Sequence, residues 1–271
     1  MLSILNSISS LTAENALSST QSSLQKSLTE LSTGLKINSG SDDAAGLSIA
    51  NGLRANISAL TQSSQNASDG VGLLQTADGA LSQVTTLLDR AVTLATEAST
   101  GGLSTSQATA LDTEYQSILT EIGSIGSTTN YNGTAIFGTT ASVYTSDGTS
   151  AGSATISTAI SALTTAGLSL TGTGLTSTAT AQTALTDISA AISTIAANRG
   201  AIGAAVNRLN ADTNVENTEV TNLTAAQNNV QNADIGATVT QMTQYSVLQQ
   251  TGMEALSQSN QAQEAVLKLL Q

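Results

Sequence analysis

Apolar residues recur every three or four positions between Val239 and Leu270, and this repeat constrains the fold more than any other feature of the sequence. Two lines of positions spaced by seven residues form it: Val239, Ser246, Met253, Asn260 and Leu267, and Met242, Gln249, Leu256, Gln263 and Leu270. Alternating steps of three and four place both lines on one face of a helix, as in a coiled coil. Several positions are polar, so a lone helix would bury too little apolar area to offset roughly 1–2 kcal/mol of backbone entropy per residue. We therefore expect a helix that needs a partner, supplied by the rest of the chain or by other copies of it.

The first residues of the chain carry a similar pattern. Leucines at heptad spacing are Leu17, Leu24, Leu28, Leu31 and Leu35, while Ile4, Ile8 and Leu11 lie out of phase with them. Residues 38–41 interrupt the repeat, and Ser41 is the expected N-cap of the next helix, with Asp42 and Asp43 in its first turn. Read instead as a metal pair, these two carboxylates have no third ligand nearby, so we favour the helix start.

Helical periodicity also fills most of the interior. It runs from Ala50 to Ala95, from Ala108 to Ile125 after the Gly101–Gly102 break, and from Leu185 to Val230. The short connection at the glycines predicts antiparallel neighbours, and residues 231–234 mark a joint before the last helix. The expected fold is mainly α: a long antiparallel helical coiled-coil rod, with paired N- and C-terminal helices and a small β-hairpin region.

Residues from about 127 to 177 are rich in Ser, Thr and Gly. Asn132-Gly133 and Asp147-Gly148 are typical of hairpin turns. The strand-like residues are Phe137, Val143, Tyr144 and Ile156, and a helical turn is expected from Ala159 to Leu163. The Ser and Thr residues of 139–180 are candidates for O-linked sugar on composition alone.

Composition excludes several classes of function. The chain has no His or Cys, which removes the usual nucleophile, general base and transition-metal ligands, and neither an enzyme nor a cofactor is expected. A net charge of −12 argues against nucleic-acid binding. No run approaches the roughly 20 apolar residues that span a bilayer, and Met1–Asn6 has neither the basic nor the apolar region of a secretory signal.

Several stretches near the two ends of the chain form long ordered motifs. In the N-terminal half they are residues 31–50 (LSTGLKINSGSDDAAGLSIA), residues 66–81 and the Asn130–Gly133 turn. In the C-terminal half they are residues 199–209 (RGAIGAAVNRL), residues 248–252, Asn260-Gln261 and residues 266–270. These stretches resemble the terminal signatures of bacterial flagellin, and the resemblance covers roughly residues 1–137 and 185–271.

The resemblance implies a self-assembling subunit of the bacterial flagellar filament. Its terminal helices, residues 1–43 and 233–271, would line an inner tube, and a coiled coil of residues 44–128 and 178–232 would form an outer tube. Residues 129–177 would replace the outer domains of longer flagellins. The seam of the inner tube would contain Leu24, Leu28, Leu31, Leu35, Val239, Met242, Met253, Leu256, Leu267 and Leu270. Before assembly, residues 1–40 and 235–271 are expected to be mobile.

The resemblance also implies partners and a location. The subunit would be exported unfolded by the flagellar type III apparatus with an export chaperone, and would meet the filament cap and hook-junction proteins outside the cell. Leu88, Asp89, Arg90, Leu94 and Glu114 fall where the family makes lateral subunit contacts and where a vertebrate innate immune receptor binds. Asp89, Thr93 and Glu97 depart from the family pattern, and an Asp89–Arg90 pair would weaken presentation to the receptor.

Two alternatives remain open. A hook–filament junction protein resembles flagellin but is used in few copies, and would not elongate filament seeds. A flagellin-like surface adhesin would bind a glycan saturably as a monomer. A protease, the enzyme found in some flagellin outer inserts, is the least favoured class, since the sequence has no His-Glu-x-x-His motif.

Overall fold

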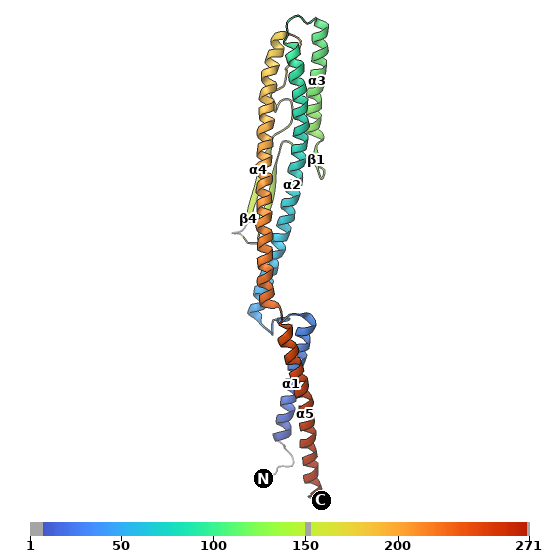
Figure 1. Cartoon of the computed structure of the whole chain (residues 1–271), viewed down its shortest axis with the longest axis vertical. Helices are drawn as coiled ribbons and strands as arrows, with labels where there is room; N and C mark the ends of the chain where they lie inside the picture. Colours follow the sequence, from blue (N-terminus) through green and yellow to red (C-terminus); the bar gives the residue numbers. More distant parts are fainter. Residues whose placement is uncertain (1–7, 150–152, 270–271) are drawn as a thin grey trace. The chain divides into compact units, whose positions relative to one another are not determined.

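The computed structural model describes residues 8–149 and 153–269, and over these residues the chain is mainly α-helical, as predicted (Figure 1). The chain divides into two compact units. We call the described parts of residues 1–54 and 223–271 the terminal unit, and those of residues 55–222 the middle unit. None of the described helices is long and apolar enough to cross a membrane.

The terminal unit pairs helix α1 (Ile8–Thr33) with helix α5 (Ile235–Leu269). The two run antiparallel, as the order of their contacts shows. The hydroxyl oxygens of Ser10 and Ser259 lie 2.8 Å apart, Leu17 packs on Gly252, and Leu35 forms an antiparallel bridge with Asn232. The predicted pairing of the chain ends is therefore confirmed (Figure 1).

Main-chain hydrogen bonds join the two segments at the end of this helix pair. Gly34, with a φ of +72°, ends α1, and its carbonyl accepts a hydrogen bond from the Ala233 amide at 2.9 Å. The amide of Lys36 donates to the carbonyl of Gln231 at 2.8 Å. With the Leu35–Asn232 bridge, these bonds form a short backbone clasp between residues 34–36 and 231–233.

The start of helix α2 (Ala44–Ala98) differs from the prediction. Asp43, not Ser41, is the N-cap, because its Oδ1 accepts the Gly46 amide at 2.9 Å. Asp42 lies in the preceding turn, where its carboxylate accepts the amides of Asn38 and Ser39. Asp42 also pairs with Lys26 at 3.2 Å. Three residues offered a suitable side chain here, and the one immediately before the first helical residue supplies the cap.

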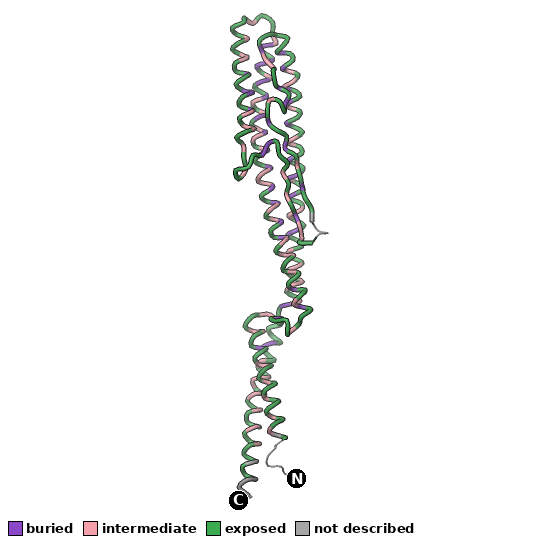
Figure 2. Tube along the Cα trace, turned by 180° about the vertical axis from the view of Figure 1, so that it is seen from behind, coloured by how far each residue is buried: buried purple, intermediate pink, exposed green. Residues whose placement is uncertain are grey.

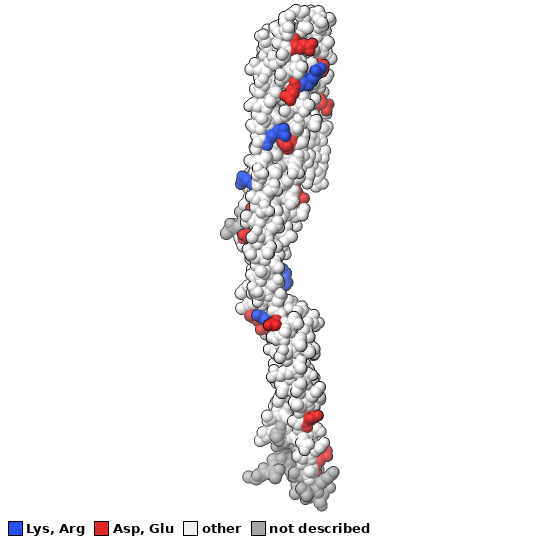
Figure 3. Space-filling view, in the orientation of Figure 1, with Lys and Arg blue, Asp and Glu red and all other residues white. Residues whose placement is uncertain are grey.

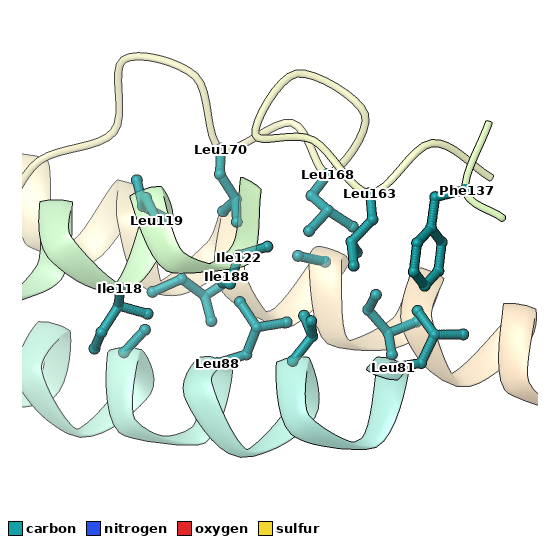
Figure 4. Packing of buried hydrophobic residues seen from close by; sticks show 14 of the residues in the cluster. Leu81, Leu88, Ile118, Leu119, Ile122, Phe137, Leu163, Leu168, Leu170 and Ile188 are labelled. Carbon is teal, nitrogen blue, oxygen red and sulfur yellow. The ribbon is translucent and has the colours of Figure 1, made fainter. Parts of the chain in front are cut away.

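In the middle unit, α2 packs with α3 (Thr105–Thr128) and α4 (Thr178–Gln231) around an aliphatic core. Leu81 and Leu88 from α2, Ile118 and Ile122 from α3, and Ile188 from α4 meet in this core (Figure 4). Ion pairs tie the helices at the surface: Arg199 with Asp78 at 2.7 Å and Arg90 with Glu114 at 2.7 Å. A reciprocal capping box between Ser104 and Gln107 starts α3 after the glycine break.

Two hairpins follow α3. Strands β1 (Asn130–Tyr131) and β2 (Thr134–Ala135) enclose Asn132 and Gly133, whose φ values of 49° and 78° confirm the predicted turn. Strands β3 (Thr139–Ser146) and β4 (Ser153–Ile160) pair in register from Thr139↔Ile160 to Ser146↔Ser153, with Asp147-Gly148 at the predicted turn. Val143 of β3 packs over Gly70 of α2, where a larger residue would clash.

The helical turn expected from Ala159 to Leu163 is wrong, because Ala159 and Ile160 end strand β4 and residues 161–163 are irregular. After β4 the chain runs along α3 without regular secondary structure over residues 161–177. Four leucines of this segment are buried: Leu163, Leu168, Leu170 and Leu175. Tyr115 bonds Thr173 at 2.6 Å, and the Leu175 amide donates to Asp112 at 2.7 Å. A segment that composition marks as polar therefore completes the core of the middle unit (Figure 4).

Candidate subunit-contact surfaces

The side of α5 that packs against α1 overlaps only partly with the expected seam. One line of expected positions lies on this side, and the other is displaced by one residue. The shielded residues of α5 are Thr238, Met242, Tyr245, Ser246, Gln249, Gly252, Leu256 and Ser259, and all but Ser246 follow one another in alternating steps of four and three. The line through Met242 and Leu256 matches the expectation, whereas its companion runs through Thr238 and Gly252 instead of Val239 and Met253. Gly252 permits the close approach, since a Cβ there would lie 3.3 Å from Leu17 Cδ1.

The other expected seam residues divide between the helix interface and the outer surface. Leu24 and Leu31 of α1 and Leu35 just after it are half-buried, whereas Leu28 is 42% exposed. Val239 and Met253 are 39% and 50% exposed. The side chain of Leu267 and all of Leu270 lie outside the described residues.

Exposed apolar residues form a surface on the outer side of α5. Val239, Val247 and Leu248 line a shallow hollow together with Thr240, Thr243 and Gln244. Val247 is 53% exposed and Leu248 is 46% exposed. We call these six residues the α5 apolar surface. The face of this unit visible in Figure 3 carries few charged side chains, so little opposes the approach of another apolar surface.

The second candidate surface lies where α2 passes α3 in the middle unit. Leu88 and Leu94 are 0% and 1% exposed and belong to the core, so a partner cannot touch them. Asp89, Arg90 and Glu114 are exposed. Arg90 Nε donates to Glu114 Oε1 at 2.8 Å, so this arginine pairs across the helices and not with its neighbour Asp89. Both partners are about half exposed, and such a pair contributes roughly 0–1 kcal/mol.

Comparison with known proteins adds the family to this geometry. The bacterial flagellin N-terminal helical region matches residues 4–142, and the bacterial flagellin C-terminal helical region matches residues 185–270. The chain belongs to the bacterial flagellin family. The two flagellin matches contain α1, α2, α3 and α5 and nearly all of α4, and they leave residues 143–184 outside.

Curated relatives support the same family. A flagellin of Serratia marcescens is 43% identical over 137 residues, which are 50% of this chain and 39% of that protein. The phase 1 flagellin of Salmonella naestved is 43% identical over 131 residues, or 48% of this chain and 26% of that protein. The chain thus spans well under half the length of these relatives. A crystal structure of Bacillus cereus flagellin aligns with 32% identity and a TM-score of 0.49, covering 60% of this chain and 94% of that one.

Both candidate surfaces lie in parts of the chain that match the flagellin family. The α5 apolar surface and the exposed groups on α2 and α3 fall inside residues 185–270 and 4–142, respectively. The part of the chain that the structure describes contains no cluster of three or more Asp, Glu, His or Cys side chains placed to hold a metal. Sequence reasoning missed the exposed positions Val247 and Leu248, although the heptad count already left both outside the seam.

Proposed function

We propose that the chain is a structural subunit that self-assembles into the bacterial flagellar filament used for swimming. The observation that carries the proposal is the α5 apolar surface, which a helix of a flagellin chain leaves exposed to solvent although it contains Val239, Val247 and Leu248. Burying apolar area stabilises an interface by about 25 cal/mol per Å². Many identical copies packed side by side would cover this surface repeatedly.

The interior of the α1–α5 pair supports the same proposal. Its most shielded side chains include Ser27 and Thr238, which are 3% and 4% exposed and bring little apolar area. Pairing within one chain therefore leaves much of the hydrophobic contribution of α5 unused. Filament assembly would bury the exposed apolar residues of α5 and would thereby stabilise the α1–α5 pair.

The experiment is seeded polymerisation followed by electron microscopy, comparing the natural chain with Val247→Asp. The carboxylate would be buried without a partner in the filament but solvated in the monomer, so elongation should stop while the monomer stays folded. Val215→Asp is the matched control, because Val215 is 57% exposed on a helix of the middle unit. Normal elongation by Val247→Asp would contradict the proposed role of this surface.

The same assay separates the proposal from its rival within the family. A hook–filament junction protein would bind seed ends in few copies and would not extend them. Nothing in the described residues favours that role or the adhesin role, and saturable glycan binding by the monomer would be required for the latter.

The remaining partners are proposed on family grounds. The subunit would leave the cell through the flagellar type III apparatus with an export chaperone, and would be added beneath the filament cap after the hook-junction proteins. A vertebrate innate immune receptor would meet Asp89, Arg90 and Glu114, the exposed members of the candidate set. A receptor-reporter assay with monomer tests this, and silence at saturating protein would exclude it.

A further inference from the structure

Two carboxylates of α4 in the middle unit, the buried Glu216 and the half-buried Asp212, each have one oxygen that lacks a hydrogen-bond partner. Glu216 is only 5% exposed. Its Oε2 and the Oδ2 of Asp212 are both inaccessible to solvent and unbonded. The two residues are four positions apart, which places them on the same face of the helix, one turn from each other. Unpaired buried carboxylates are costly, so this arrangement requires a compensating group.

Glu216 also connects three elements of the unit. Its Oε1 accepts a hydrogen bond from the hydroxyl of Ser63 on α2. The Ser63 Oγ in turn accepts the amide of Ser146, at the end of β3, at 2.9 Å. The state of this one carboxyl therefore bears on how α2, α4 and the β3–β4 hairpin are held together.

The groups that face Glu216 favour its neutral form. Burial raises the pKa of Glu216, the hydrogen bond from Ser63 lowers it, and the charges of Asp212 and Glu219 on the same helix raise it further. From α2 and β3 the facing groups are a hydroxyl and an amide, which carry no charge. The ion pairs shown for the described residues involve Asp42, Glu114 and Asp78, and none reaches this site.

We propose that Asp212 and Glu216 form a proton-binding site that ties the middle unit together more firmly as the pH falls. A proton taken from water onto Oε2 of Glu216 makes that oxygen a donor, and Oδ2 of Asp212 is the unbonded acceptor one turn away. One bound proton thus removes the buried negative charge of Glu216 and supplies a hydrogen bond between the two unbonded oxygens. Ser63 can keep its hydrogen bond to Oε1 in either state.

A proton suits this site better than a metal ion does. Calcium takes 6–8 oxygen ligands, whereas the described groups around the pair are two carboxylates, the Ser63 hydroxyl and a backbone amide that cannot ligate. Asp212 and Glu216 lie within the middle unit of a single chain, so their protonation can be tested without filament assembly.

The first test compares thermal unfolding of the full chain with that of Glu216→Gln from about pH 4 to pH 8. A carboxyl whose folded pKa is raised contributes stability that is complete below its unfolded pKa and is lost as the pH rises through the folded value. The amide is neutral throughout, so the variant should melt about 2–4 °C above the natural chain near pH 8, with the difference vanishing in acid. Glu121→Gln, which removes an exposed carboxylate of α3 that does not act on Glu216, should parallel the natural chain.

A second measurement does not depend on the variant folding well. The ¹³C shift of the Glu216 carboxyl in the natural chain should titrate above the ordinary value of 4.5, and Asp212→Asn should lower its midpoint by removing the like charge. A midpoint at or below the ordinary value would overturn the proposal. Saturable stabilisation by calcium chloride or sodium chloride that is lost in Glu216→Gln would overturn it in favour of a cation.

Discussion

The two units of this flagellin-family chain are both built from antiparallel helices, yet buried residues are frequent in the middle unit and sparse in the terminal unit (Figure 2). The middle unit buries Leu, Ile and Ala along α2, α3 and α4, reinforced by the segment after β4. In the terminal unit the α1–α5 interface has Ser27 and Thr238 among its most shielded side chains. Helical periodicity alone does not make a helix pair stable. The middle unit has its own core, whereas α1 and α5 depend on surfaces beyond their own pairing.

The largest expected effect is a difference in amide hydrogen exchange between the units of the dilute monomer. Amides of residues 8–40 and 235–269 should open at a free-energy cost near zero, as mobile ends do, while those of α2 and α4 in the middle unit should approach the global value of about 5–15 kcal/mol. Strong protection of α5 without added seeds would mean that the terminal unit is as stable as the middle unit. Protection gained on polymerisation would show that contacts with other copies stabilise α1 and α5.

Truncation of core leucines should come next. Leu88→Ala removes a side chain that is 0% exposed, and should lower the free energy of unfolding by about 2–5 kcal/mol. Leu28→Ala in α1, where the side chain is 42% exposed, should cost within about 0.5 kcal/mol. Urea denaturation of both variants measures the contrast. Equal losses would mean that the α1–α5 pair is as well packed as the middle unit.

The core of the middle unit could be predicted from the sequence only in part. The seven-residue spacing of Leu74, Leu81 and Leu88 predicts that they lie on one buried face of a helix. Leu163, Leu168, Leu170 and Leu175 do not, because they lie on irregular chain with no period and among Ser, Thr and Gly. Their burial comes from tertiary contacts with α3, such as the Tyr115–Thr173 bond, which no local pattern encodes.

The candidate surfaces show a similar division. Along α5, Met242 and Leu256 of the heptad count lie on the shielded side toward α1. Thr238 and Gly252 take the inner positions beside them, and Val239 and Met253 are exposed. Close helix approach favours small side chains, and the register depends on what the partner helix presents there. The pairing of Arg90 with Glu114 likewise needed the distance between two helices, which the sequence does not contain.

A smaller effect is expected at the α2–α3 surface. Arg90→Ala removes an ion pair whose partners are about half exposed, and should lower the free energy of unfolding by no more than about 1 kcal/mol. If the same variant abolishes receptor signalling in the reporter assay, recognition is separated from folding. Arg208→Ala is the matched control, because Arg208 is an exposed arginine of α4 outside this surface.

The smallest expected effect concerns the turn before α2. The hydrogen bond from Lys26, and then those from Ser39 and Asn38, lower the pKa of Asp42 from 3.8 to about 2. A carboxyl with a lowered pKa contributes stability above its unfolded pKa and loses it as the pH falls through the folded value. Melting of the natural chain and of Asp42→Asn should therefore differ at pH 5 and converge toward pH 2. A difference that persists in acid would assign the effect to something other than the charge.

The clasp between residues 34–36 and 231–233 has a consequence for how such a chain can change over generations. Its bonds join amides and carbonyls, so they survive substitution of most side chains in both segments, except for changes to Pro and for replacement of Gly34, whose φ is +72°. The alignment of the two tails is anchored where they leave the clasp and not by the residues they share farther along. Mutation can thus vary the outward faces of α1 and α5 to suit new neighbours without letting one helix slide past the other.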